Sequence, residues 1–198
     1  MKLLITVLLL FGFSYTSTAQ LKKGIWLVGG SGSFYAYSEE YSSANINQKG
    51  TFTNIDVTAT LGYFIIDKFA LGLRPGFNSY KGKITTPGGG STNSFQLVAG
   101  PFLRYYFLKV DKPFNFLADL CYQPGINKYL NGAGEKGKFN TLSILGGAEL
   151  FFNSAVGIEI LMGYSSKIIT IDNTPGGFKN TRRGFKTSVG FQIHLDKL

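Results

Sequence analysis

Hydrophobic and polar residues alternate with a period of two in eight separate stretches of this chain. The clearest stretch runs from Phe185 to Asp196, where nearly every odd position is apolar and nearly every even position is polar or glycine. Only a β-strand places alternate residues on opposite faces, and ~9–11 residues is the length of a strand that crosses a bilayer. The pattern therefore predicts eight strands of membrane-spanning length.

The connections between these stretches fall into two classes. We expect three tight turns, at Asp67–Lys68, Val110–Lys112 and Asn153–Ser154, and four long polar loops, at Tyr37–Gly50, Lys81–Asn93, Pro124–Lys138 and Ser166–Arg183. Short turns on the periplasmic side and long loops on the outside are typical of membrane barrels. The predicted fold is all-β: an eight-stranded antiparallel up-and-down transmembrane β-barrel.

The N-terminal segment has the pattern of a cleavable export signal. Lys2 supplies a positive start, Leu3–Phe13 an apolar stretch, and Ser17–Ala19 a small-residue cleavage site. The apolar stretch is too short for a spanning helix, which needs about 20 residues. We therefore predict a signal peptide at 1–19, one barrel domain at 20–198, and an outer-membrane location.

Alternation alone also fits a soluble lipocalin-like carrier, whose apolar face points inward. Three features favour lipid on the apolar side: small polar residues on the other face, no charge inside the apolar face, and aromatic residues at two levels, as in the girdles of membrane barrels. The expected girdle residues are Tyr63, Phe64, Phe69, Tyr105, Tyr106, Phe107, Phe114, Phe151 and Phe152 near the turns, and Tyr35, Tyr80, Phe95, Tyr122 and Tyr164 near the loops.

Two prolines fall inside predicted strands. Pro75 and Pro101 each lack a ladder donor. We expect bulges or weakened pairing between their two neighbouring strands.

The polar face carries charged residues that we expect in the lumen. They are Asp56, Arg74, Arg104, Asp119, Glu149 and Glu159, with Lys186 beside them. A buried charge without a partner costs several kcal/mol. Our hypothesis is that Arg74 and Arg104 bridge the carboxylates and plug the lumen; an ion-conducting path lined by the same residues is the alternative.

Catalytic chemistry has weak support. His194 is the only histidine, and Ser188 lies six positions away on the same predicted strand, too far for a hydrogen bond. A Ser188–His194–Glu149 arrangement remains the enzymatic alternative. The single cysteine, Cys121, excludes an intrachain disulfide and a thiolate cluster. We predict no catalytic residues, no metal and no cofactor.

Basic residues dominate the expected loops of this chain, whose formal net charge is +9. The expected extracellular basic rim consists of Lys81, Lys83, Lys136, Lys138, Lys179, Arg182 and Arg183. These cations suit the phosphates of outer-leaflet lipopolysaccharide, with a surface glycan or a protein as the alternative partner. Nucleic acid is not expected, since the charges are scattered over several loops.

Three stretches carry a family resemblance. Gly62–Gly72, Gly100–Phe107 and Leu150–Glu159 resemble the short-turn hairpins of the small outer-membrane β-barrel family of Gram-negative bacteria, the OmpX-type proteins. The resemblance implies an adhesive, protective or unassigned role and no shared catalytic residues. We predict a non-enzymatic barrel that acts through its basic extracellular loops, in adhesion or surface binding, or as a membrane-stabilising element. A small pore or a lipid-modifying enzyme is the alternative.

The resemblance also implies assembly. Family members are inserted by the barrel-assembly machinery and usually end on an aromatic residue, whereas the last residue here is Leu198. Either recognition would then rest on Phe191 or insertion would be less efficient. We expect a monomer.

Overall fold

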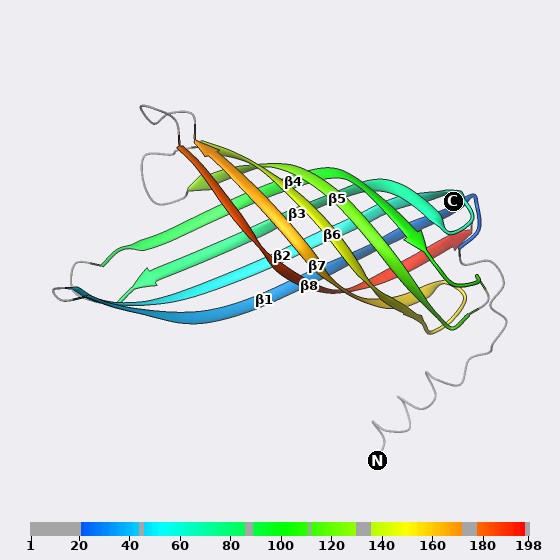
Figure 1. The fold of residues 1–198 in the computed structure, drawn as a ribbon, viewed down its shortest axis with the longest axis horizontal. Coiled ribbons are helices and arrows are strands. Elements are labelled where there is room, and N and C mark those ends of the chain that lie inside the picture. The colour runs from blue at the N-terminus through cyan, green and yellow to red at the C-terminus, as the bar shows by residue number, and fades with distance from the viewer. Residues whose placement is uncertain are drawn as a thin grey trace, which may run out of the picture.

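A computed structural model describes residues 21–43, 46–85, 89–110, 112–129, 136–171 and 178–196. The strands are β1 (Ile25–Ser43), β2 (Ile46–Ile66), β3 (Phe69–Ile84), β4 (Ser91–Tyr106), β5 (Phe114–Tyr129), β6 (Lys136–Phe151), β7 (Val156–Ile171) and β8 (Phe178–Asp196). Each pairs with its sequence neighbours, and β8 pairs antiparallel with β1 to close the barrel (Figure 1). The eight-stranded closed fold is thereby confirmed. The expected signal peptide at 1–19 lies outside the described residues.

The strands are longer than predicted, with 16 to 21 residues each. They continue well into the four segments expected as long loops, which leaves connections at 44–45, 85–90, 130–135 and 172–177. We call this the loop end of the barrel; the connections at 67–68, 107–113 and 152–155 form the turn end. The expectation of long loops was wrong. Backbone N–H and C=O groups can continue to pair between two strands whose side chains are polar on both faces and face water.

The closing seam of the barrel is shorter than the other ladders. Within the described residues, β1 pairs with β8 over Ile25–Gly32 and with β2 along almost its whole length. Beyond Gly32 the β1–β2 hairpin therefore continues away from β8, as Figure 1 shows at the loop end. The β1–β8 pairing that closes the barrel therefore lies in its turn-end half.

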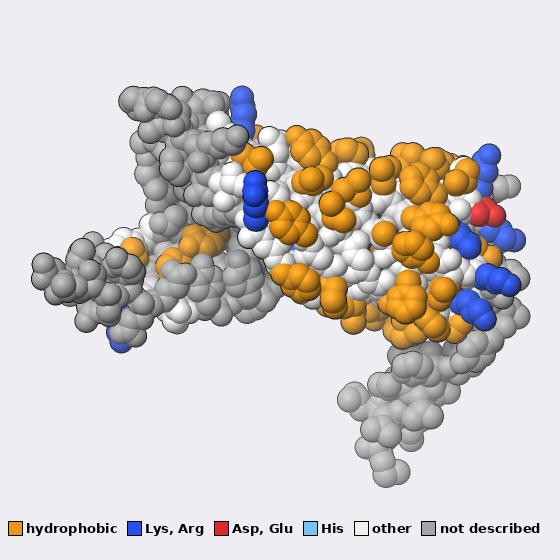
Figure 2. Space-filling view, in the orientation of Figure 1, with side chains coloured by type: hydrophobic (Ala, Val, Ile, Leu, Met, Phe, Trp, Pro, Cys, Tyr) orange, Lys and Arg blue, Asp and Glu red, His pale blue; other side chains and the backbone are white. Residues whose placement is uncertain are grey.

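The outer wall is apolar on every strand. Large hydrophobic side chains from Trp26 on β1 to Phe191 on β8 are exposed, including Leu73 at 59% and Ile144 at 56%. Figure 2 shows hydrophobic side chains over the visible face of the barrel wall, between ends that carry lysine and arginine. Five charged residues of the opposite face are buried inside the barrel: Arg74, Arg104, Asp119, Glu149 and Glu159. The carrier orientation is therefore excluded, and the apolar faces point outward as predicted.

Three of the expected girdle residues face the lumen. Phe64, Tyr106 and Phe151 are buried, and they join Leu21, Leu27 and others in the core of the turn end. Exposed aromatics such as Tyr105, Phe107, Phe114 and Phe152 do form a belt there. The prediction failed for the three because adjacent aromatics point to opposite faces of a strand.

The N-terminal described residues close the turn end. Leu21 is fully buried in the core, and its carbonyl accepts a 2.7 Å hydrogen bond from the Lys68 amide. The Lys23 amide donates to Asp67 Oδ1 at 2.8 Å. Lys68 has a φ of 67°, which fits the second residue of this tight turn.

The prolines interrupt the sheet, but on the sides opposite to the expected one. The β3–β4 ladder is continuous through Pro75 and Pro101. The gaps lie instead between β2 and β3, from Thr58–Gly76 to Leu61–Leu73, and between β4 and β5, from Val98–Gly125 to Phe102–Cys121. The Pro75 nitrogen faces β2 and the Pro101 nitrogen faces β5. The missing backbone donors therefore affect the β2–β3 and β4–β5 ladders. Neither gap shifts the register.

Candidate functional site

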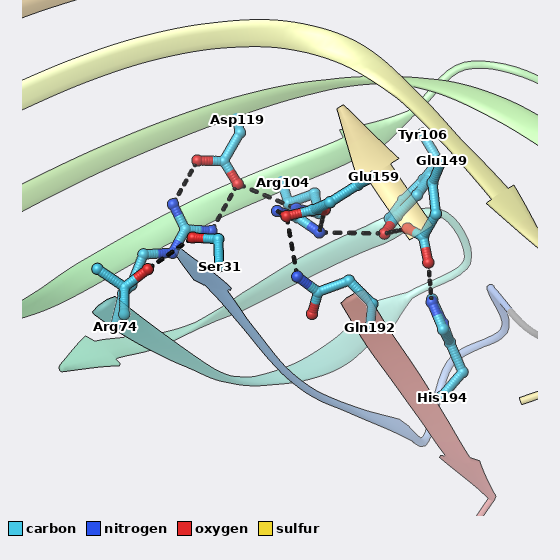
Figure 3. A network of polar contacts seen from close by, with 10 residues as sticks. Ser31, Arg74, Arg104, Tyr106, Asp119, Glu149, Glu159, Gln192 and His194 are labelled. Carbon is cyan, nitrogen blue, oxygen red and sulfur yellow. Dashed lines mark hydrogen bonds and ion pairs between the residues drawn. The ribbon is translucent and has the colours of Figure 1, made fainter. Parts of the chain in front are cut away.

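An ion-pair network crosses the lumen in the turn-end half of the barrel (Figure 3). Arg74 on β3 donates to both carboxylate oxygens of Asp119 on β5, at 2.7 and 2.8 Å. Arg104 on β4 donates its Nε to Asp119 Oδ2 at 3.0 Å and its Nη1 to Glu159 Oε2 on β7 at 2.7 Å. Asp119 therefore joins both arginines, and Arg104 joins two carboxylates.

The network continues through further polar side chains on β4, β6 and β8. Tyr106 on β4 donates to Glu149 Oε2 on β6 at 2.6 Å, and His194 Nε2 on β8 lies 2.9 Å from Glu149 Oε1. Gln192 on β8 donates to Glu159 Oε1 at 2.9 Å. Arg104 Nη1 and the Tyr106 hydroxyl, 3.4 Å apart, connect the two parts. The combined network touches six strands, from β3 to β8.

Water is largely excluded from these charges. Arg104 and Glu149 are 0% exposed, Asp119 is 1% and Glu159 is 2%. The Phe102 ring lies 4.5 Å from the Arg74 guanidinium carbon and 5.9 Å from that of Arg104. Desolvating such charges is costly, and only bidentate or multiple hydrogen bonds of good geometry offset the cost. The observed contacts meet that requirement.

Two of the expected lumen charges lie outside this network. Asp56 accepts 2.8 Å hydrogen bonds from Asn54 and Asn78, nearer the loop end. Lys186 lines a cavity of about 20 Å³ beside Arg74, together with small hydroxyl residues such as Ser31 and Ser188. That volume holds about one water molecule. The structure therefore brings together Arg74, Arg104, Asp119, Glu149 and Glu159.

Of the two contacts in the expected Ser188–His194–Glu149 arrangement, the structure contains the one between His194 and Glu149. His194 and Glu149 are hydrogen-bonded, as a base and its orienting carboxylate would be. His194, however, packs among the rings of Phe64, Tyr106 and Phe151 at the turn end. Ser188 lines the separate cavity. Among the residues described, no group of three or more His, Cys, Asp or Glu side chains could hold a metal ion.

The expected basic rim lies at the loop end. All seven residues belong to strands rather than loops: β3, β6 and β8 carry them. Lys81, Lys83, Lys138 and Arg183 are exposed. The side chains of Lys136, Lys179 and Arg182 are not among those described.

Sequence reasoning missed three members of the network. Tyr106 was expected in a girdle, and Gln192 and His194 were assigned only to the polar face of the last strand. The parity of the strands already contained the signal, since these residues share the inward face of Arg104, Glu149 and Glu159. Which inward residues meet across the lumen depends on the register between strands.

The apolar wall, the closed ladder and the buried charges together define a membrane-spanning β-barrel with a filled interior. A similar solved structure is the outer membrane protein OprG from Pseudomonas aeruginosa, with a TM-score of 0.54 and 14% identity over 90% of this chain and 99% of that one. Neisserial surface protein A (NspA) aligns with a TM-score of 0.45 and 18% identity, over 86% and 97%.

The likeness to OprG shows that this chain has the fold of a small eight-stranded outer-membrane β-barrel. The fold implied by the family resemblance is confirmed. No protein-family model matches the chain, and no curated protein matches its sequence. The described residues include no helix long and apolar enough to span a bilayer.

Proposed function

We propose that this protein is a non-enzymatic integral outer-membrane barrel with a closed lumen, which acts through the basic residues of its loop end. The apolar outer wall supports residence in a membrane. The observation that carries the proposal is the ion-pair network, because it fills the section of the lumen through which ions would pass.

Opening this lumen would break several charge-assisted hydrogen bonds at once. Each such bond contributes about 1.5–3 kcal/mol, and Arg104 alone takes part in bonds to Asp119 and Glu159. An eight-stranded barrel is just wide enough for its own side chains to fill. The network thus favours a plug over an ion-conducting path lined by the same residues.

Single-channel recording in planar bilayers tests the closed lumen. We expect no stable conductance from protein whose insertion is verified by protease protection. A sizeable, long-lived conductance step would contradict the proposal and favour the small-pore alternative. Analysis of lipid species by mass spectrometry after expression tests the enzymatic alternative, and unchanged species agree with a non-enzymatic barrel.

The loop end is the proposed contact surface, with lipopolysaccharide phosphates as its first partner and a surface glycan or protein as the alternative. A lysine or arginine near an anionic surface contributes about 1 kcal/mol. Changing Lys81, Lys83 and Arg183 together to glutamine should weaken binding to lipopolysaccharide strongly. Lys109→Gln with Lys112→Gln, at the turn end, is the charge control. Equal losses for both sets would contradict a loop-end surface.

We also propose that the protein is a monomer inserted by the barrel-assembly machinery. The complete ring of eight paired strands supports the monomer, because within the described residues every strand is hydrogen-bonded on both sides over part of its length. Light scattering of the detergent complex, corrected for bound detergent, tests this.

A further inference from the structure

A groove of about 470 Å³ lies on the outer wall where β4, β5 and β6 meet. It is lined by Leu97, Val98, Ala99, Pro124, Gly125, Ile126, Lys138, Phe139 and Asn140. Its volume falls within the range of small-molecule sites, about 300–1,000 Å³. The groove belongs to the lipid-facing wall, since Leu97 and Ile126 on its sides are 46% and 47% exposed.

The groove exists because the sheet is interrupted beneath it. The β4–β5 ladder stops after Val98–Gly125 and resumes at Phe102–Cys121. Pro101 and Pro124, one on each strand, lack the donors that would bridge this gap. Glycine at 125 lets the buried Phe139 ring pack against the β5 backbone, because a β-carbon there would collide with that ring and lie 2.7 Å from the Leu97 carbonyl oxygen.

The floor of the groove is fixed from the lumen side. Phe139 is 2% exposed, and the Lys167 ammonium lies 3.9 Å from the centroid of its ring. Lys167 in turn hydrogen-bonds Gln96 on β4. A cation over a ring and a charged hydrogen bond both hold this aromatic in place. The groove is therefore preformed, which lowers the cost of binding.

Charge is distributed unevenly along the groove. Strand register aligns Leu97, Ile126 and Lys138 in one row, with Pro124 and Asn140 in the next row toward the barrel middle. Lys138 of the first row is exposed on the loop-end side of the groove. Its positive charge favours an anion at this end of the groove.

We propose that the groove holds one lipid A molecule of the surrounding outer leaflet, with an acyl chain along Leu97, Ala99 and Ile126 and a phosphate near Lys138. This assignment rests on the proposed outer-membrane location and loop-end orientation, and it identifies one binding position within the general lipid contact. An apolar groove with Lys138 at its loop-end side matches the two parts of such a lipid, an acyl chain and a phosphorylated headgroup.

Two variants test the two halves of the site. Ala99→Phe, on β4, fills the groove. Its matched control is Ala118→Phe, at an exposed alanine on β5 outside the groove. Lys138→Gln removes the cation of the first row, with Lys112→Gln at the turn end as control. Native mass spectrometry of the detergent-solubilised, folded barrel with added lipid A, dephosphorylated lipid A or phosphatidylglycerol measures the bound lipid.

We expect the unsubstituted protein to retain one lipid A, and dephosphorylated lipid A and phosphatidylglycerol to be retained at least tenfold less. Ala99→Phe should weaken retention about tenfold or more. Lys138→Gln should weaken it about fivefold, as the loss of one lysine near an anionic surface predicts. Ala118→Phe and Lys112→Gln should have little effect. Equal retention of lipid A by Ala99→Phe and Ala118→Phe would overturn the proposal, as would equal retention of phosphatidylglycerol.

A measurement on the unsubstituted chain covers the case in which Ala99→Phe does not fold. Lipid A with a spin label on an acyl chain should broaden the amide signals of Leu97, Ala99 and Ile126 and spare those of Ile158 and Ile160 on β7. Uniform broadening around the wall would refute the site. The two proposals fail on different measurements. Conductance would contradict the closed lumen alone, whereas loss of lipid A retention would contradict the groove alone.

Discussion

The substitution Asp119→Asn removes the carboxylate that joins both arginines of the lumen. Asp119 accepts hydrogen bonds from Arg74 at 2.7 and 2.8 Å and from Arg104 at 3.0 Å, and it is 1% exposed. An asparagine keeps the size of the side chain but has no charge, and its NH2 group is a donor where the second carboxylate oxygen accepted a hydrogen bond from an arginine. Arg74 and Arg104 would then face each other with Glu159 as the one carboxylate bonded to Arg104.

The expected loss of folding free energy is about 3–5 kcal/mol, the usual cost of breaking a buried ion pair by removing one partner. The control is Asp56→Asn, because Asp56 also faces the lumen but accepts its bonds from the neutral amides of Asn54 and Asn78. Its loss should stay near 1 kcal/mol, the typical net contribution of a hydrogen bond.

Urea unfolding in phospholipid vesicles, followed by tryptophan fluorescence and by heat-dependent gel migration, measures both variants. The single tryptophan, Trp26, lies on the outer wall of β1, where it reports insertion. If Asp119→Asn loses no more than Asp56→Asn, the ion pairs do not stabilise the barrel, and the plug argument is refuted.

Three further predictions concern the wall of the barrel. Gly72→Ala should destabilise the barrel by about 1–3 kcal/mol, because a β-carbon at Gly72 meets the Leu61 carbonyl oxygen and the Gly62 backbone; Gly184→Ala, with open space around it, should change stability by less than about 0.5 kcal/mol in the same unfolding assay. Leu120→Arg places a charge on the lipid face, where Leu120 is 40% exposed, and should cost about 2–4 kcal/mol near the bilayer middle; a loss below 1 kcal/mol would argue against membrane burial of this position. Hydrogen exchange should be faster for the Ala99 and Tyr122 amides, which border the β4–β5 gap, than for amides of the continuous β3–β4 ladder, and equal rates would show that the gap is closed in solution.

Much of the fold follows from alternation alone. Phe185–Asp196 gave the last strand and its faces correctly, and the apolar positions of the other strands point outward as predicted. Strand ends were not predictable, because residues such as Lys81 and Lys83 are compatible with either a loop or a solvated strand. Polar composition indicates contact with water and does not reveal whether the backbone ladder continues.

The site was predictable in its membership and not in its geometry. Inward parity selected Arg74, Arg104, Asp119, Glu149 and Glu159, but it could not show that Asp119 takes both arginines while Asp56 takes asparagines. Those choices depend on strand tilt and register, which bring β4 residues across the lumen to β7. The prediction of weakened pairing between the two proline-containing strands, β3 and β4, was wrong for the same reason. The sequence places Pro75 in a strand but does not show whether its nitrogen faces β2 or β4.

The placement of Gln192 and His194 on β8 has a consequence for the order of assembly. Glu159 and Glu149, on β7 and β6, receive these partners from β8, the strand that closes the barrel against β1. Until β8 arrives and meets β1, the arginines and carboxylates stand in an open, hydrated sheet. Ring closure and drying of the interior are thus a single late event, and contacts so distant along the chain predict slow, cooperative maturation.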